Sequence, residues 1–221
     1  MVDYYFYTKG GIFLSNSFEN LNNQKKQRII NAALAEFAQK KYDYASTNSI
    51  VKKAQIGKGM LFHYFGNKKN LYIYLYKYVR KVMDNEICSQ IDISKGDLPS
   101  ILRQIGVRKL EVLRRHPDMT DFIAQAKNEK SPEVYEELEK IEKERSYQLR
   151  ENFLFGSLDM NLLKPEFRNE NTIKLIRWAL DGCTKELQDK YKGQDIQDPA
   201  IDVLMRDYDK YVEIIRQAYY C

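Results

Sequence analysis

The sequence is poor in the residues that build most catalytic and metal sites. It contains 2 histidines and 3 cysteines among 221 residues, and they are scattered along the chain. Scattered cysteines provide neither a disulfide framework nor the ligand spacing of a zinc site. Neither a glycine-rich phosphate loop nor a nucleophile and base at a recognisable spacing occurs. We therefore expect no enzyme activity and no metal or cofactor.

Long apolar runs are also missing. No stretch approaches the ~20 apolar residues that a membrane-spanning helix needs, and the N-terminus lacks the basic and then apolar layout of a signal peptide. Hydrophobic residues still make up 43% of the chain, which is enough to bury a core. These features predict a cytoplasmic globular protein with free thiols and no membrane contact.

Proline is absent before residue 99, and each of the five prolines lies at or near a predicted helix boundary. Elsewhere apolar residues recur at helical spacing, and no strand-like alternation competes. This pattern predicts an all-α fold of eight to ten helices. The expected helices cover about residues 22–40, 47–54, 58–65, 68 onward, 97–115, 118–127, 131–155, 170–191 and 198–219.

Charge is divided unevenly along the chain, although the formal total is only +5. Residues 20–81 carry 13 basic and 2 acidic side chains, a net charge of +11. Residues 82–221 carry 22 basic and 27 acidic side chains, a net charge of −5. This division predicts two modules with different partners, and a polyanion is a candidate partner of the basic one.

Two short amphipathic helices in the basic block, residues 47–54 and 58–65, are joined by a tight turn. Such a helix-turn-helix binds DNA by laying its second helix in the major groove. Leu61 and Phe65 are expected to anchor the second helix to the core. The outward residues are then Lys58, Gly59, Met60, His63 and Tyr64, with Phe62 at the edge. Taken alone, however, helical hairpins and basic helical surfaces are more often ordinary solvent-exposed structure.

This region resembles the N-terminal domain of the tetracycline-repressor (TetR) family over about residues 24–75. The resemblance rests on Ile30–Phe37, Tyr42–Asp43, Ala45–Thr47, Ile50–Val51, Ala54, Lys58–Gly59, Leu61–Phe65, Asn67–Lys68 and Leu71, in that order. It implies a three-helix DNA-binding domain at residues 20–68. A larger helical bundle for ligand binding and dimerisation would follow at residues 69–221. Residues 1–19 would be an extension, either a flexible arm or an artefact of where the reading frame was started.

The resemblance also implies roles on DNA for particular residues. Base edges would be faced by Lys58, Gly59, Met60 and His63, the sugar-phosphate backbone by Phe62 and Tyr64, and phosphates by Ser46, Thr47 and Lys68. The sequence departs from the family's usual residues at Gln55, Gly57, Met60 and Phe62. These departures leave few hydrogen-bonding side chains on the outward face. Met60 and Phe62 therefore offer little beyond apolar contact with thymine methyl groups.

Two apolar stripes run along the last two long helices. They consist of Ile173, Ile176, Leu180, Cys183 and Leu187, and of Ile201, Leu204, Tyr208, Tyr211 and Ile215. Each stripe has the spacing of a helix-bundle seam. The resemblance implies that these helices from two subunits form a four-helix bundle in a homodimer. The alternative, that both stripes serve only the core of one chain, stays open.

The resemblance further implies a small-molecule effector, bound among the helices of about residues 72–180. Possible lining residues, none of them assigned, are Phe122, Tyr147, Phe153, Phe155, Trp178, Arg103 and Arg145. The expected function is a ligand-responsive repressor that binds a palindromic double-stranded DNA operator as a dimer. The alternative is a helical ligand-binding or scaffold protein whose basic face meets acidic partners without sequence-specific DNA binding.

Overall fold

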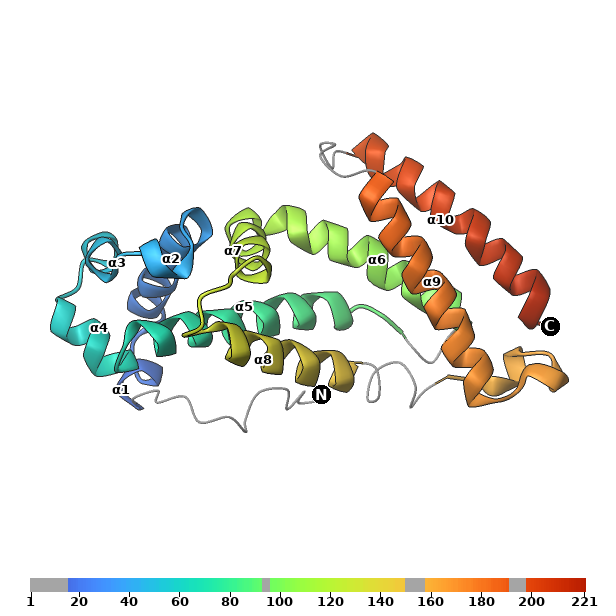
Figure 1. Ribbon diagram of the computed structural model, residues 1–221, viewed down its shortest axis with the longest axis horizontal. Coiled ribbons are helices and arrows are strands. Elements are labelled where there is room, and N and C mark those ends of the chain that lie inside the picture. The colour runs from blue at the N-terminus through green and yellow to red at the C-terminus, as the bar shows by residue number, and fades with distance from the viewer. Residues whose placement is uncertain (1–15, 93–95, 150–157, 191–197) are drawn as a thin grey trace. The chain divides into compact units, whose positions relative to one another are not determined.

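The protein is described from a computed structural model covering residues 16–92, 96–149, 158–190 and 198–221 (Figure 1). Within these ranges the regular elements are helices, apart from one isolated bridge between Leu163 and Tyr220. The all-α prediction is confirmed. None of the described helices is long and apolar enough to cross a membrane.

The chain forms two compact units. The first consists of the described residues up to 86 and residues 111–148, and the second of residues 87–110 and the described residues from 149 onward. These units are defined by packing and not by function, so the functional boundary near residue 68 stays a prediction.

The first unit begins with short helices whose ends follow local signals. In chain order it contains α1 (Asn16–Glu19), α2 (Asn23–Gln39), the 3-10 helix η1 (Tyr42–Tyr44), α3 (Thr47–Ala54), α4 (Lys58–Phe65), most of α5 (Lys68–Cys88), α7 (Pro117–Lys127) and α8 (Tyr135–Gln148). The side chain of Asn22 caps α2 by accepting the Lys25 N–H at 2.8 Å. Such caps satisfy N–H groups that have no partner inside the helix.

Aromatic side chains fill the core of the first unit, where α2 packs on α3 and α7. Phe37 on α2 meets Tyr72 on α5 at 4.8 Å and Phe122 on α7 at 6.4 Å between ring centroids. Tyr72 and Phe122 lie 5.3 Å apart in a T-shaped contact. Large apolar rings at these distances contribute both buried area and favourable edge-to-face geometry. They join the short N-terminal helices to α5 and α7.

Charged side chains join α5 to α8 within the same unit. Arg80 is buried and pairs with Glu142 at 2.8 Å, and both groups contact the Tyr76 hydroxyl. Arg145 forms a two-bond pair with Asp84, with both distances 2.6 Å. Because removing one partner of a buried pair leaves an uncompensated charge, such networks fix one packing arrangement.

The second unit contains the first part of α6 (Leu98–Arg115), the 3-10 helices η3 (Met160–Leu162) and η4 (Pro165–Phe167), α9 (Glu170–Lys190) and α10 (Asp198–Tyr219). Asp97 caps α6 by accepting the Ser100 N–H at 2.7 Å and also pairs with Arg216 at 2.7 Å. The Arg216 pair ties the start of α6 to α10.

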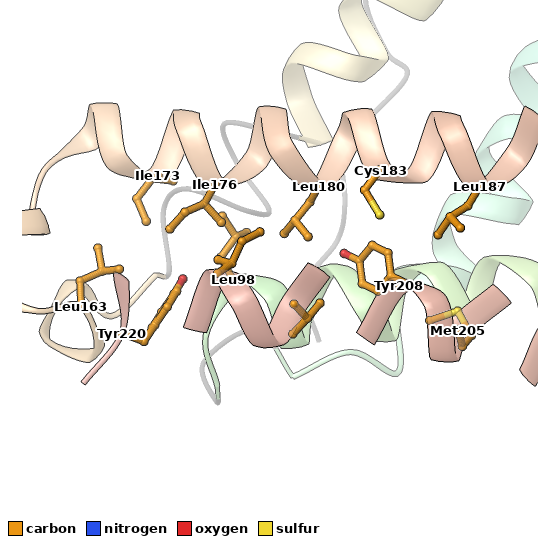
Figure 2. Packing of buried hydrophobic residues seen from close by; sticks show 12 residues of the cluster. Leu98, Leu163, Ile173, Ile176, Leu180, Cys183, Leu187, Met205, Tyr208 and Tyr220 are labelled. Atoms are coloured by element: carbon orange, nitrogen blue, oxygen red, sulfur yellow. The ribbon is translucent and has the colours of Figure 1, made fainter. Parts of the chain in front are cut away.

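The core of the second unit is the seam between α9 and α10. All five predicted α9 seam residues are buried and point toward α10, as the labelled side chains in Figure 2 show. The α10 prediction is only partly right: Tyr208 and Ile215 are buried and Leu204 packs partly buried against the same cluster, but Tyr211 is 39% exposed. Met205 and Val212 take its place in the seam. The side chain of Ile201 lies outside the described residues.

This seam corrects the interpretation of the two stripes. The buried residues of the α9 stripe pack against the buried residues of the α10 stripe, and Leu98 of α6 belongs to the same cluster (Figure 2). A side chain that is already buried inside one chain offers no surface to a second copy. The buried seam residues are therefore part of the core of one chain, which favours the alternative interpretation for them, and pairing through other sides of α9 and α10 stays a prediction.

Candidate nucleic-acid interface

The turn between α3 and α4 has the geometry of a compact helix-turn-helix. Gln55 adopts a left-handed conformation, with φ 55° and ψ 48°, and its N–H donates to the Lys52 carbonyl at 3.3 Å. The Ile56 N–H donates to the Val51 carbonyl at 3.1 Å. These bonds satisfy the end of α3, although a left-handed conformation costs a non-glycine residue ~1–2 kcal/mol. The chain then enters α4 through Gly57.

The two helices bury the residues that the sequence predicts. Ile50 and Ala54 of α3 are buried, as are Leu61 and Phe65 of α4. We call the exposed side of α4 the α4 outer face, which consists of Lys58, Gly59, Met60, Phe62 and His63. The structure therefore brings these five predicted residues together on one short helix.

The glycines at the start of α4 are not explained by packing inside the described chain. A Cβ added at Gly57 or Gly59 would have no heavy atom within 4 Å. Gly57 also has an ordinary extended conformation, with φ −71°. Glycine inside a helix costs ~1 kcal/mol relative to alanine. The open space beside both residues lets an external backbone approach α4 closely.

The prediction that the Tyr64 side chain faces outward is wrong. Tyr64 is only 3% exposed and does not belong to the α4 outer face. Its ring lies 5.7 Å from that of Phe18, a residue of α1 that is itself fully buried. Tyr64 is therefore buried because α1, which precedes the helix-turn-helix, covers this side of α4.

Ser46 and Thr47 lie at the start of α3, as predicted. Ser46 is the N-cap, and its hydroxyl accepts the Ser49 N–H at 3.4 Å. Both residues are partly exposed, and the first turn of α3 contains no acidic side chain. No acid of α3 itself opposes the partial positive charge at this helix start, and the one carboxylate beside it, Glu36 of α2, is paired with Lys40. Such a helix start attracts phosphate.

Glu36, a buried acid in the basic block, fastens the start of α3 to α2. Its carboxylate accepts the Ser46 N–H at 3.0 Å and pairs with Lys40 at 2.7 Å. Burial raises the pKa of Glu36, but hydrogen bonds from Lys40, the Ser46 N–H and Ser49 outweigh that effect and lower the pKa to about 2. The charged Glu36 carboxylate therefore holds the start of α3 in place against α2.

The Lys68 side chain is engaged inside the protein, which corrects the expectation of a free phosphate ligand. Its ammonium donates to the carbonyl of Tyr42 at 2.8 Å and to those of Asp43 and Ala45 at 3.3 Å. It also lies 4.4 Å from the centroid of the Tyr42 ring. All three of its donors are thus satisfied by η1 and the residue after it. Lys68 holds the connection between α2 and α3 in place.

Replacing Lys68 by methionine should destabilise the protein without changing the salt dependence of DNA binding. The change leaves carbonyl groups of η1 without their charged donor, and we expect a loss of ~1.5–3 kcal/mol in the free energy of unfolding. Urea unfolding measures that loss, and Lys52→Met is the control because Lys52 is exposed. If Lys68 instead bound a phosphate, the slope of log affinity against log salt would fall by about one.

Three buried residues that support this site were missed by the sequence analysis. Phe18 lies in a segment without a helical period, and Glu36 is one acid among many basic residues. The third, Glu129, follows α7 and accepts the Tyr42 N–H at 2.7 Å and the Ser131 N–H at 2.9 Å. Only Glu36 carried a signal, since an acid next to the apolar Phe37 stands out in a block of net charge +11.

The possible effector residues that the structure describes belong to both units, and several of them already have other roles. Phe122 is part of the core of the first unit, whereas Tyr147 and Trp178 are each 61% exposed. Arg103 is paired with Asp209, and Arg145 with Asp84. The remaining two, Phe153 and Phe155, lie outside the described residues. Within the part of the chain that the structure describes, no group of acidic, histidine and cysteine side chains could hold a metal ion.

Comparisons with known proteins agree with this geometry. The model of the family described as "Bacterial regulatory proteins, tetR family" matches residues 29–75, which contain α3 and α4. The Transposon Tn10 TetC protein of Escherichia coli is 33% identical over 84 residues, or 35% of this chain and 43% of that protein. The match thus spans less than half the length of TetC.

Longer matches cover the rest of the chain. The Staphylococcus aureus regulator IcaR, described as an HTH-type negative transcriptional regulator of the biofilm operon icaADBC, is 20% identical over 176 residues. That match covers 76% of this chain and 94% of IcaR. The solved structure of a TetR family transcriptional regulator from Chloroflexus aurantiacus J-10-FL superposes with a TM-score of 0.60 at 21% identity. It covers 96% of this chain and all of that one.

The family model covers the helix-turn-helix, and the solved structure shares the helical fold over nearly the whole chain. Both findings agree with the helix-turn-helix formed by α3 and α4 and with the helices described in the second unit. Residues 29–75 thus match the tetR family of bacterial regulatory proteins, and the chain shares the overall fold of a solved TetR family regulator.

Proposed function

We propose that this chain is a homodimeric repressor that binds a palindromic operator in double-stranded DNA and is released from it by a small molecule. The observation that carries the proposal is the α4 outer face, where five residues of one short helix are exposed above a buried anchor. The relative IcaR is described as a negative regulator, which favours repression over activation.

On DNA, α4 would lie in the major groove. Lys58 can donate to a guanine edge or to a phosphate, and His63 can hydrogen-bond to a base edge. Met60 and Phe62 are 37% and 36% exposed and suit apolar contact with thymine methyl groups. Gly57 and Gly59 let the DNA backbone come close. We therefore expect each half-site of the operator to contain A·T pairs next to one base pair whose edge hydrogen-bonds to Lys58 or His63.

Phosphate contacts would come from the start of α3 and not from Lys68. Ser46 and Thr47 lie at that start, where the helix dipole attracts an anion. Tyr44, which ends η1 just before them, is 78% exposed, and its hydroxyl can donate to a phosphate. These contacts would set the register of α4 on the duplex.

Dimerisation would use the exposed side of the last two helices. Leu175 and Trp178 of α9 are 53% and 61% exposed, and Ile214 of α10 is 64% exposed. Tyr211 of α10 is also exposed, none of these four residues belongs to the buried seam cluster, and we call them together the α9/α10 outer face. Exposed large apolar side chains that gather into a patch mark interaction sites. A two-fold dimer would present two α4 helices to half-sites ~34–36 Å apart.

Release by a small molecule follows from the same arrangement. An effector that binds better to a dimer with mismatched α4 spacing shifts the population away from the DNA-bound state. The coupling is reciprocal, so operator DNA must weaken effector binding by the same factor.

Selection from random DNA duplexes with the purified chain tests this function. We expect enrichment of a palindrome, bound with an affinity that falls steeply as salt is raised. Recovery of sequences no different from the starting pool would instead favour a helical scaffold whose basic face meets acidic partners. Affinity that does not change between low and moderate salt would also contradict DNA binding.

A further inference from the structure

The short helix α1 is attached to the back of α4 through one aromatic side chain. Phe18 is fully buried, and its ring lies 4.7 Å from Phe65 and 5.7 Å from Tyr64, both on α4. It also lies 5.4 Å from Tyr74 on α5 in a T-shaped contact. Phe18 therefore packs against both α4 and α5, the helix that follows it; the helices α1, α4 and α5 are labelled in Figure 1.

A second contact fastens α1 to α2. The ammonium of Lys26 donates to the Glu19 carbonyl and to the Glu19 carboxylate, both at 3.0 Å. The same ammonium lies 5.7 Å from the centroid of the Phe18 ring. The position of Phe18 is thus set by contacts with α2, α4 and α5. Although Lys26 lies in the basic block, it serves this attachment.

An eight-residue helix such as α4 has little stability of its own, because isolated helices shorter than ~12–15 residues are marginal in water. Its orientation must come from tertiary contacts. Leu61 and Phe65 lie one turn apart, so these two contacts by themselves would leave α4 able to rotate about the line that joins them. Phe18 adds a contact beside that line, on Tyr64, and so restricts rotation of α4 about it.

We propose that Phe18 is a positioning residue that sets the rotation of α4 and thereby the base specificity of the α4 outer face. The inference rests on the proposed function. Base contacts need side chains placed to within fractions of an ångström, whereas phosphate contacts at the start of α3 do not pass through Phe18. Removing the Phe18 side chain should therefore weaken binding to the operator and leave binding to non-specific DNA unchanged.

The test compares Phe18→Ala with wild type on the selected operator and on an unrelated duplex of equal length. We expect operator affinity to fall about tenfold, the loss of one well-placed base contact. Affinity for the unrelated duplex and its salt slope should stay unchanged. Phe18→Leu keeps most of the apolar volume of the phenylalanine side chain. It should therefore retain most of the operator affinity that Phe18→Ala loses.

A matched control separates positioning from stability. Ile141→Ala removes a buried side chain from α8 in the same unit and should lower the unfolding temperature as well. We expect it to keep the ratio of operator to non-specific affinity when binding is measured well below that temperature. If Ile141→Ala lowered the ratio of operator to non-specific affinity as much as Phe18→Ala does, the proposal would be overturned. Phe18 would then act only on stability.

Hydrogen exchange gives a readout that does not depend on DNA. Amides of α4 should exchange faster in Phe18→Ala than in wild type, while those of α3 keep their protection. Unchanged α4 protection together with an unchanged operator ratio overturns this inference alone. A wild-type chain that enriches no operator overturns the proposed function and this inference with it.

Discussion

Replacing Trp178 by glutamate should convert the proposed dimer into monomers and lower operator affinity by about 100-fold or more. Trp178 is 61% exposed on α9, and Leu175 lies beside it on the same outer face. A carboxylate at this position would have to be buried without a partner in any dimer that uses the α9/α10 outer face. Each α4 would then bind its half-site alone, without the ~10²–10⁴ gain from a linked second site.

Sedimentation measures the association state, and fluorescence anisotropy measures the operator affinity of the same sample. The control is Tyr147→Glu, because Tyr147 of α8 has the same exposure of 61% and lies outside the α9/α10 outer face. We expect this variant to remain a dimer with wild-type affinity. A Trp178→Glu protein that still sediments as a dimer would show that the subunits pair through another surface.

The fold could be predicted closely because its helix boundaries depend on local signals. Ser46 caps α3 and Asp97 caps α6 through contacts three residues away. Pro117 opens α7 after a break at His116. A cap or a proline acts within one turn, so the sequence near the boundary contains all the information that places it.

The orientation of two site residues could not be predicted, since their partners are distant in sequence. Tyr64 is covered by Phe18, and Lys68 reaches carbonyls more than 20 residues before it. The helical spacing of Leu61 and Phe65 identifies the buried side of α4 but not what else packs beside it. A lysine in a basic block looks the same whether it faces solvent or caps a loop.

The apolar stripe of α9 shows the same limit at a larger scale. Its spacing predicts a helix partner correctly, and Leu180 and Cys183 are buried against α10. Spacing does not say whether the partner helix belongs to the same chain. Once α10 occupies that side, the exposed Trp178 and Leu175 become the informative residues for pairing.

Glutamine in place of Glu36 should lower the free energy of unfolding by ~3 kcal/mol at pH 7, the equivalent of moving a carboxyl pKa from 4.5 to about 2. Glutamine keeps the shape of the side chain and can still accept the Ser46 N–H. It loses the charge that pairs with Lys40 at 2.7 Å. Denaturant unfolding at pH 7 measures the loss.

The pH dependence distinguishes this charge effect from a packing defect. A carboxyl whose pKa is lowered by folding stabilises the folded state fully above its unfolded pKa of about 4.5. That contribution disappears as the pH falls from about 4.5 toward about 2, because the folded state must then also bind the proton. The gap between wild type and Glu36→Gln should therefore close across this range. Glu139→Gln, an exposed change on α8, should show no such gap.

The same variant reports on DNA binding through the start of α3. Without the Glu36 charge, the Ser46 N–H keeps a weaker acceptor, and the start of α3, where we propose phosphate contacts, is held less firmly. We expect both operator and non-specific affinity to fall together in Glu36→Gln at pH 7, because phosphate contacts contribute to both. Phe18→Ala is expected to lower operator affinity alone. Glu36 and Phe18 would thus control separate parts of one interface, the first its grip on phosphates and the second its choice of bases, and a Glu36→Gln protein that lost only operator affinity would contradict this division.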